Sequence, residues 1–245
     1  MGQADAVSLT AHALVLAHSP LTGPAAWGRL PEVLREREHD VTVLSVTDDT
    51  EPPYAGRYVA RAALQVADLA PERPVHLVGH SGAGYLLPQI GAARRAARRA
   101  VAGYVFLDAG VPHGRGATRS SSLSAEDADA AAELEIVLAA GGAYPSWTDD
   151  DLRDLVPDDV TRAALVASLR PRHADFFTEP LPFPGDWPDA PCGVVALSPS
   201  YAGVSRVARS RGWPVVERDL AGGHFAACTD PTGVADALET LLLDL

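Results

Sequence analysis

The chain of 245 residues contains no lysine, so all 20 of its basic residues are arginine. This absence excludes a lysine Schiff base and the lysine of a phosphate-binding P-loop. Cysteine is also scarce: Cys192 and Cys228 are the only two, and they do not form a C-x-x-C pair. Two separate cysteines are too few for a disulfide framework, so we expect small, reduced core thiols.

Basic charge is in the minority, because 32 acidic residues give a net charge of −12. This balance argues against nucleic acid or an anionic membrane surface as the main partner. No apolar run approaches the roughly 18 residues of a membrane span. Residues 1–5 lack the basic start of a secretory signal, so we expect a cytoplasmic protein. No group of histidine, cysteine or aspartate has metal-ligand spacing, and we expect no metal or organic cofactor.

Short apolar segments alternate with helical patterns along most of the chain. Because these segments are apolar on both faces and are separated by helices, they predict an α/β fold. Its central sheet should be mostly parallel, with helices on both faces. The expected strands are 13–17, 41–46, 75–78, 101–107, 193–197 and 214–217, and the expected helices are 25–38, 56–69, 81–99 and 232–243.

The alternation is interrupted between Pro112 and Pro191. This stretch has helical patterns at 125–140, 149–155 and 158–169, followed by a proline-rich segment, 180–191. We expect one core domain made of residues 1–111 and 192–245. Residues 112–191 are expected to form a helical cap over the carboxyl ends of the strands, where open α/β sheets bind their ligands.

The segment Gly79-His80-Ser81-Gly82-Ala83-Gly84 follows an apolar strand and precedes a helical pattern. A serine between small residues at this position is typical of a nucleophile elbow. The turn places the hydroxyl at a helix N-terminus, where unpaired N–H groups and the helix dipole favour a developing negative charge. We predict that Ser81 is a nucleophile; the alternative is a glycine-rich turn that binds a phosphate or nothing.

A serine hydroxyl needs a base within hydrogen-bond reach. The best candidate is His224, because two glycines precede it in a loop between the last strand and the last helix. His80 adjoins Ser81 but is expected to point away from it.

The base needs a carboxylate to orient it. Asp108 closes the apolar strand 101–107, where a buried charge requires a partner. A local backbone cap is the other interpretation of Asp108, and Glu217 and Asp219 are alternative acids.

Acyl transfer also needs two N–H donors for an oxyanion. Gly82, directly after the serine, should supply one, and the loop after the first strand should supply the other. Pro20 in that loop has no N–H, which leaves Ser19 or Leu21. The residues expected to line an apolar pocket, with core packing as the alternative for each, are His18, Trp27, Tyr85, Tyr144, Trp147, Phe176, Phe177 and Phe225.

Together these residues resemble the α/β-hydrolase superfamily, whose chain order of serine, acid and histidine agrees with Ser81, Asp108 and His224. More narrowly, the chain is similar to the small esterase and hydroxynitrile-lyase branch and its bacterial relatives. The segments that carry this resemblance are Leu77–Ser81, Val105–Ala109 with Pro112, Arg211–Pro214 and Gly223–Phe225.

Three positions depart from the pattern of that superfamily. Ala83 replaces the usual glycine of the elbow, and His18-Ser19-Pro20 replaces the usual His-Gly. The loop 198–201 lacks the acid that most members hold there. Some members place the acid one strand earlier, which is the position of Asp108.

The resemblance implies a serine hydrolase that cleaves an ester, thioester or lactone of a small, apolar molecule through an acyl-enzyme. The same residues could instead catalyse elimination, carbon–carbon cleavage or cyclisation, as in a lyase. A non-catalytic binding protein on this scaffold is the third interpretation. We expect a small-molecule substrate as the partner, and the sequence leaves open whether the chain forms a homodimer.

Overall fold

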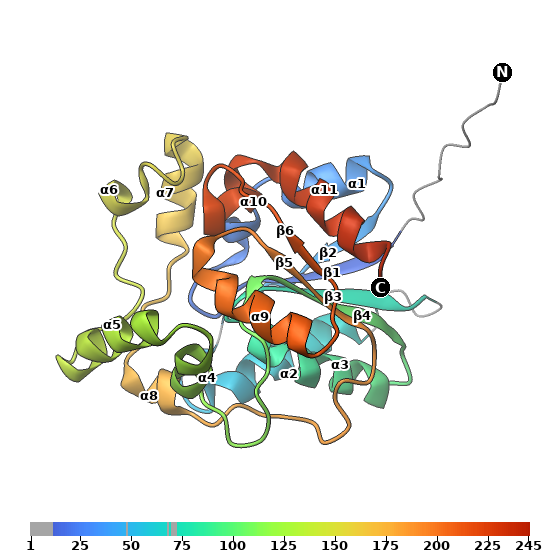
Figure 1. Ribbon diagram of the computed structural model, residues 1–245, viewed down its shortest axis with the longest axis horizontal. Helices are drawn as coiled ribbons and strands as arrows, with labels where there is room; N and C mark the ends of the chain where they lie inside the picture. Colours follow the sequence, from blue (N-terminus) through green and yellow to red (C-terminus); the bar gives the residue numbers. More distant parts are fainter. Residues whose placement is uncertain (1–11, 48, 68, 70–72) are drawn as a thin grey trace.

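The computed structural model describes residues 12–47, 49–67, 69 and 73–245, and a six-stranded sheet lies at its centre (Figure 1). All neighbouring strands are parallel, in the order β2-β1-β3-β4-β5-β6. The predicted mostly parallel α/β architecture is therefore confirmed. The strands are β1 (Ala13–Ala17), β2 (Asp40–Val43), β3 (Val75–Ser81), β4 (Val101–Ala109), β5 (Cys192–Ala196) and β6 (Val215–Glu217).

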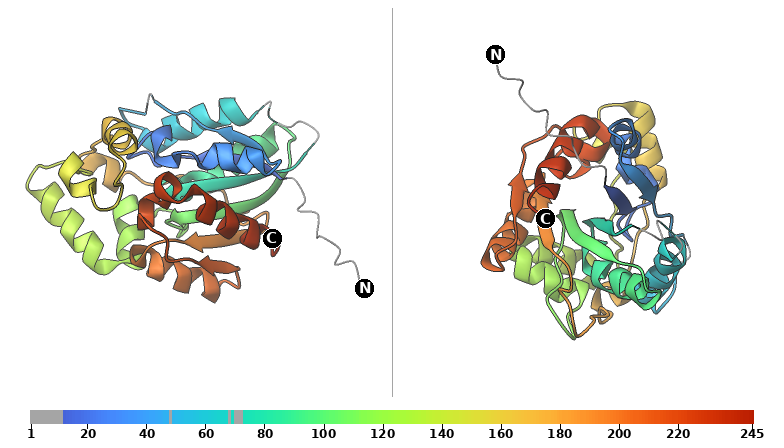
Figure 2. Two further views of the ribbon diagram at one scale, coloured as in Figure 1. Left: turned by 90° about the horizontal axis from the view of Figure 1, so that it is seen from above. Right: turned by 90° about the vertical axis from the view of Figure 1, so that its right-hand side faces the viewer.

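Helices cover both faces of the sheet (Figure 2). Helices α1 (Leu30–Glu36) and α11 (Pro231–Leu242) pack on one face, and α2 (Tyr54–Val66), α3 (Leu87–Ala96) and α9 (Ala202–Ser210) pack on the other. Successive strand residues contribute to opposite faces, and each face buries its own apolar cluster. Double coverage explains why the central strands β1 and β5 are buried at every residue.

Residues 112–191, which we call the insert, connect β4 to β5, and the helices of the insert gather beyond the carboxyl ends of the strands (Figure 1). The sequence predicts one helix over 125–140, but the structure has two: α4 ends at Glu126 and α5 begins at Ala128. The side chain of Asp127 accepts a hydrogen bond from the Ala130 N–H at 3.0 Å and starts a new helix. The insert contains α4 (Arg119–Glu126), α5 (Ala128–Ala139), α6 (Asp149–Leu152), α7 (Asp159–Ala167) and α8 (Ala174–Thr178).

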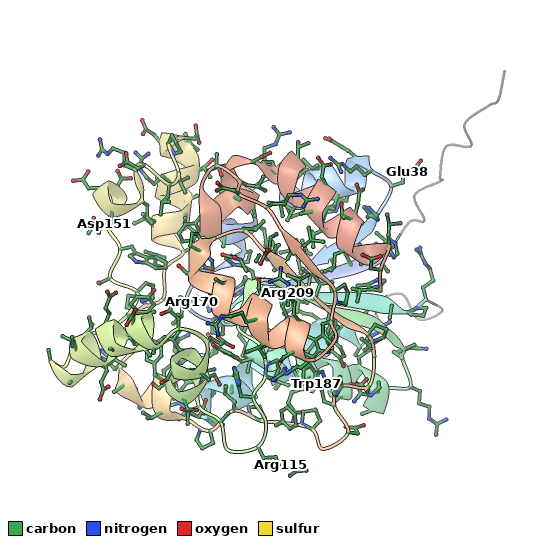
Figure 3. All side chains as sticks on the ribbon, in the orientation of Figure 1. Glu38, Arg115, Asp151, Arg170, Trp187 and Arg209 are labelled. Atoms are coloured by element: carbon green, nitrogen blue, oxygen red, sulfur yellow. The ribbon has the colours of Figure 1, made fainter. Side chains whose placement is uncertain are left out.

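A buried ionic contact holds the insert against the core. Asp49, in the loop between β2 and α2, is fully buried, and its Oδ1 lies 3.0 Å from Nη1 of Arg170 and 2.9 Å from Nη2 of Arg172. Arg172 also donates to the backbone oxygen of Asp49 at 2.8 Å. Figure 3 labels Arg170, whose side chain lies between the insert and the core. Loss of one partner would leave a buried charge, so this contact fixes the insert over the sheet end.

Helix α9 was not among the helices expected from the sequence. Glycine and serine lower its helix propensity, but Val204 and Ala208 are fully buried on one side of it. Gly203 permits close packing on the insert, because a Cβ there would lie 1.8 Å from the backbone oxygen of Glu126. Tertiary packing outweighs local propensity in this segment.

Candidate active site

The end of β3 forms a sharp turn around Ser81, which has a φ of +57°. A positive φ is costly for a residue with a side chain and is often found at functional sites. The 3-10 helix η2 (Gly84–Leu86) and then α3 follow directly. Gly84 permits this path, because a Cβ there would lie 2.1 Å from the backbone oxygen of Gly110.

Asp108 occupies a β-bulge at the end of β4. His80 is opposite Leu107 and Ser81 is opposite Ala109, so Asp108 is the extra residue in the β3–β4 pairing. Its φ of +42° is a second positive value for a residue with a side chain. A bulge redirects a side chain relative to the regular alternation of a strand. Here the redirected carboxylate reaches the loop that follows β5.

The carboxylate of Asp108 is fully buried and accepts four hydrogen bonds. Its Oδ1 accepts from the N–H groups of Leu197 at 2.7 Å and Ser198 at 3.1 Å. Its Oδ2 accepts from Oγ of Ser198 at 2.7 Å and from Nδ1 of His224 at 2.8 Å. Burial by itself would raise the pKa of Asp108, but the bonds from His224, Leu197 and Ser198 lower it below its ordinary value. Asp108 is thus an ionised carboxylate that accepts a hydrogen bond from Nδ1 of His224. This bond orients the imidazole and leaves its Nε2 able to act as a base.

His224 lies in the 3-10 helix η4 (Gly223–Phe225), directly before α10 (Ala226–Thr229). The two preceding glycines have positive φ values, +86° at Gly222 and +49° at Gly223. A Cβ at Gly222 would lie 2.2 Å from Oγ1 of Thr229. The Gly-Gly pair is therefore required by the backbone path that presents the imidazole. The alternative acids, Glu217 and Asp219, are both exposed.

Two aromatic rings stack on the imidazole of His224. The His80 ring is 4.4 Å away at 28°, and the Tyr201 ring is 5.3 Å away at 10° between planes. Nε2 of His80 donates to the backbone oxygen of His224 at 3.0 Å. Burial lowers the pKa of His80 to about 3, so it is a neutral donor. His80 thus connects the loop of His224, the candidate base, to the strand that ends at Ser81, the candidate nucleophile.

The loop after β1 approaches the elbow beside Gly82. A Cβ at Gly82 would lie 3.4 Å from Oγ of Ser19 and 3.6 Å from Cδ of Pro20. The N–H of Leu21 donates to Oγ of Ser19 at 3.2 Å, so this N–H is used within the loop. Of the two predicted donors in this loop, Ser19 is the one whose N–H is not used in this way.

A cavity of about 490 Å³ opens at the carboxyl ends of the strands. Its core wall includes Ser81, Gly82, Ser19 and His224. The insert supplies much of the opposite wall, which is largely apolar. The predicted aromatic residues that line this cavity are Tyr85, Tyr144, Trp147, Phe176, Phe177 and Phe225.

Two residues predicted for the pocket lie behind its wall instead. Nδ1 of His18 donates to the backbone oxygen of Ser19 at 2.8 Å, and its Nε2 accepts from the N–H of Val46 at 3.2 Å. Burial lowers the pKa of His18 to about 4, so the ring is a neutral support for the loop. Trp27 is 1% exposed and packs against His80, with ring centroids 5.7 Å apart. Both side chains belong to the core beneath the site.

Several polar residues of the site were not expected from the sequence. Tyr201 lines the cavity, and Ser198 binds Asp108; both follow β5 at its carboxyl end. The carboxyl end of a parallel strand is a position where polar residues of a ligand site are expected, so this position was a usable signal. Two further lining residues, Glu126 and Arg119, gave no sequence signal.

The contacts of Glu126 and Arg119 join distant parts of the chain. Glu126 accepts from the Tyr85 hydroxyl at 2.8 Å and from the Val111 N–H at 2.9 Å. The Arg119 guanidinium lies 3.8 Å above the Phe176 ring and donates to that residue's backbone oxygen at 2.8 Å. These contacts fix the wall of the cavity around the candidate nucleophile.

Within the described part of the chain, no group of three or more histidine, cysteine, aspartate or glutamate residues is arranged to hold a metal ion. None of the described helices is long and apolar enough to cross a membrane.

Comparison with known proteins connects this geometry to a family. The family model described as "Alpha/beta hydrolase family" matches residues 14–237. No curated protein matches the chain. A tomato methylketone synthase I structure is 16% identical with a TM-score of 0.69, covering 96% of this chain and 99% of its own. An extracellular α/β-hydrolase from a Paenibacillus species is 16% identical with a TM-score of 0.72, covering 94% of this chain and 98% of its own. Polyneuridine aldehyde esterase is 16% identical with a TM-score of 0.68, covering 94% of this chain and 99% of its own.

Proposed function

Because the chain belongs to the α/β-hydrolase family, we propose that it is a serine hydrolase that cleaves an ester of a small, largely apolar molecule. The observation that carries this proposal is the hydrogen bond of 2.8 Å between Nδ1 of His224 and Oδ2 of Asp108, beside a cavity that Ser81 also lines. The similarity in fold to an esterase agrees with it. Thioesters and lactones present the same acyl carbon and are included in the proposed substrate class.

In the proposed reaction, Oγ of Ser81 attacks the acyl carbon while Nε2 of His224 takes its proton. Asp108 keeps the imidazole oriented and stabilises its charged form. The N–H groups of Gly82 and Ser19 bind the oxyanion. The proton then passes from His224 to the leaving group. Water activated by the same histidine cleaves the acyl-enzyme and restores Ser81.

The cavity supports a substrate of moderate size with an apolar acyl group. Its volume of about 490 Å³ falls in the range of small-molecule sites. The insert wall contributes Leu134, Trp147 and Phe177, which offer apolar contact and few donors. We expect the rate to depend on acyl length, rising until the chain fills the cavity.

The proposal is tested by turnover of p-nitrophenyl esters of graded acyl length, together with labelling by a fluorophosphonate probe. Wild type should be labelled at Ser81, and Ser81→Ala should lose both labelling and turnover by at least about 10³-fold. Ser146→Ala is the matched control, because Ser146 lines the same cavity. Equal turnover by wild type and Ser81→Ala would contradict the proposal.

Water labelled with ¹⁸O separates hydrolysis from the alternative chemistry. Hydrolysis places the label in the released acid, because water attacks the acyl-enzyme. Labelling of Ser81 by the probe without ¹⁸O in any product would instead support elimination or another lyase reaction at the same residues.

A further inference from the structure

The buried carboxylate of Asp108 accepts hydrogen bonds from a side chain outside the proposed triad. Its Oδ1 accepts from two backbone N–H groups, those of Leu197 and Ser198. Its Oδ2 accepts from Nδ1 of His224 at 2.8 Å and from Oγ of Ser198 at 2.7 Å. The hydroxyl of Ser198 and the imidazole of the candidate base therefore share one oxygen atom.

Ser198 lies beside the loop of the candidate base, behind the wall of the cavity. A Cβ at Gly223, the residue before His224, would lie 3.7 Å from Cβ of Ser198. Tyr201, three residues further along the same loop, stacks on the imidazole of His224. Ser198 itself is partly buried and is not among the residues that line the cavity. It can therefore act on the base through Asp108 without contact to a bound substrate.

The hydroxyl of Ser198 matters most while the imidazole of His224 is uncharged. A fully buried carboxylate is costly unless donors compensate its charge, and a neutral N–H is a weaker donor than a charged one. When His224 gains a proton, its bond to Oδ2 becomes charge-assisted and draws on the same negative charge as the bond from Ser198. The Ser198 bond is then weaker. Ser198 therefore stabilises the uncharged imidazole more than the charged one.

We infer that Ser198 is a positioning residue, whose hydroxyl holds Oδ2 of Asp108 against His224 and favours the uncharged, basic form of that imidazole. This inference rests on the triad assignment in the proposed function. The proton transfer is unchanged: the proton moves from Oγ of Ser81 to Nε2 of His224, while Ser198 keeps its own proton. Ser198 thus acts through Asp108 and touches no reacting atom.

Two other titratable side chains face the imidazole of His224, and neither changes charge near neutral pH. They are His80 from β3 and Tyr201 from the loop after β5. Burial lowers the pKa of His80 to about 3. Burial and the carboxylates of Asp108 and Glu126 raise the pKa of Tyr201 well above its ordinary value. A loss of rate on acidification between about pH 8 and pH 5 therefore reports the pair of Asp108 and His224.

The test measures two rates across this pH range in wild type, Ser198→Ala and Ser198→Thr. The first is the rate constant for labelling of Ser81 by a fluorophosphonate probe, and the second is kcat/KM for a p-nitrophenyl ester. Alanine removes the hydroxyl and keeps the backbone N–H that binds Oδ1. We expect the acidic limb of both profiles to move up by about half to one pH unit in Ser198→Ala, which lowers the rates on that limb about 3- to 10-fold.

Two further readouts distinguish positioning from a merely structural role. The KM of Ser198→Ala should stay within about twofold of wild type, because Ser198 does not line the cavity. Ser198→Thr retains the hydroxyl and should restore the wild-type profiles. Ser210→Ala is the matched control, because the Ser210 hydroxyl donates to the backbone oxygen of Val207 at 2.7 Å, at the exposed end of α9. It should leave both profiles unchanged.

The outcomes separate this inference from the proposed function. An unmoved acidic limb in Ser198→Ala, or a loss of the same size at every pH, would overturn the role of Ser198 and leave hydrolysis by Ser81 intact. A shifted limb for labelling of Ser81, with no ester turnover by wild type, would support the role of Ser198 and contradict hydrolysis. If wild type is not labelled at Ser81, both the inference and the proposed function fail.

Discussion

Each end of the parallel sheet carries a histidine hydrogen-bonded to a carboxylate. At the carboxyl end, His224 pairs with Asp108 at 2.8 Å. At the amino end, Nε2 of His39 pairs with Oε1 of Glu239 at 3.0 Å, and Arg37 also binds Glu239. The two hydrogen bonds are of similar length, and each joins residues that are far apart in the chain.

The surroundings of the two pairs differ. The carboxyl end adds Ser81 on its strained turn, the N–H of Gly82 and the large cavity. At the amino end, His39 accepts from the N–H of His12, and the imidazole of His12 packs edge-on against His76 at 4.9 Å. None of the three amino-end histidines lines the cavity. We therefore expect only the carboxyl-end pair to take part in catalysis, because the proposed nucleophile and oxyanion donors lie beside it.

The largest expected effect on turnover is a difference between substitutions of His224 and of His39. We expect His224→Gln to lower kcat/KM for a p-nitrophenyl ester by about 10⁴-fold, because Ser81 would lose its proposed base. His39→Gln should leave turnover within about twofold of wild type. Steady-state kinetics of the two variants measure this contrast. A comparable loss of turnover in both would show that the two ends are functionally coupled.

The next largest effect on turnover is a difference between substitutions of Asp108 and of Glu239. Asp108→Asn should lower kcat/KM by about 10²- to 10⁴-fold, because an amide no longer selects the correct imidazole tautomer. Glu239→Gln should leave turnover unchanged and lower the free energy of unfolding by about 1–3 kcal/mol, as for a hydrogen bond to a charged group. Kinetics and urea denaturation give the two readouts. Near-wild-type activity in Asp108→Asn would remove Asp108 from the triad.

The smallest expected effect concerns acid stability. Burial, with the charges of His12 and His39, lowers the pKa of His76 to about 4 in the folded chain, against about 6.5 when unfolded. The unfolded chain therefore binds protons first as the pH falls. Stability is full above pH 6.5 and declines between pH 6.5 and pH 4.

At pH 5 the contribution of His76 is a loss of about 2 kcal/mol relative to pH 8. Urea denaturation at a series of pH values measures this slope. His76→Gln should make it shallower, while part of the slope persists because burial also lowers the pKa values of His18 and His80. An unchanged slope in His76→Gln would show that the amino end does not titrate as described.

Much of the fold could be predicted because local patterns reflect it. Apolar runs and helical spacing located all six strands, and the strand-to-helix position of Ser81 identified the elbow. Helix α9 was missed because its burial, not its propensity, stabilises it. His18 and Trp27 were expected to line the pocket, but they pack inward beneath it, because which side of a segment faces a cavity depends on tertiary packing.

The sequence by itself determined the parallel sheet, the elbow around Ser81 and the glycine-supported loop of His224, because each depends on residues that are adjacent in the chain. Only the tertiary structure decided which carboxylate meets His224, which residues close the cavity and that Tyr201 stacks on His224. Asp108 and His224 are 116 positions apart, and they meet through a one-residue bulge and the strand order β3-β4-β5. Such contacts depend on strand order and register, which no local pattern encodes.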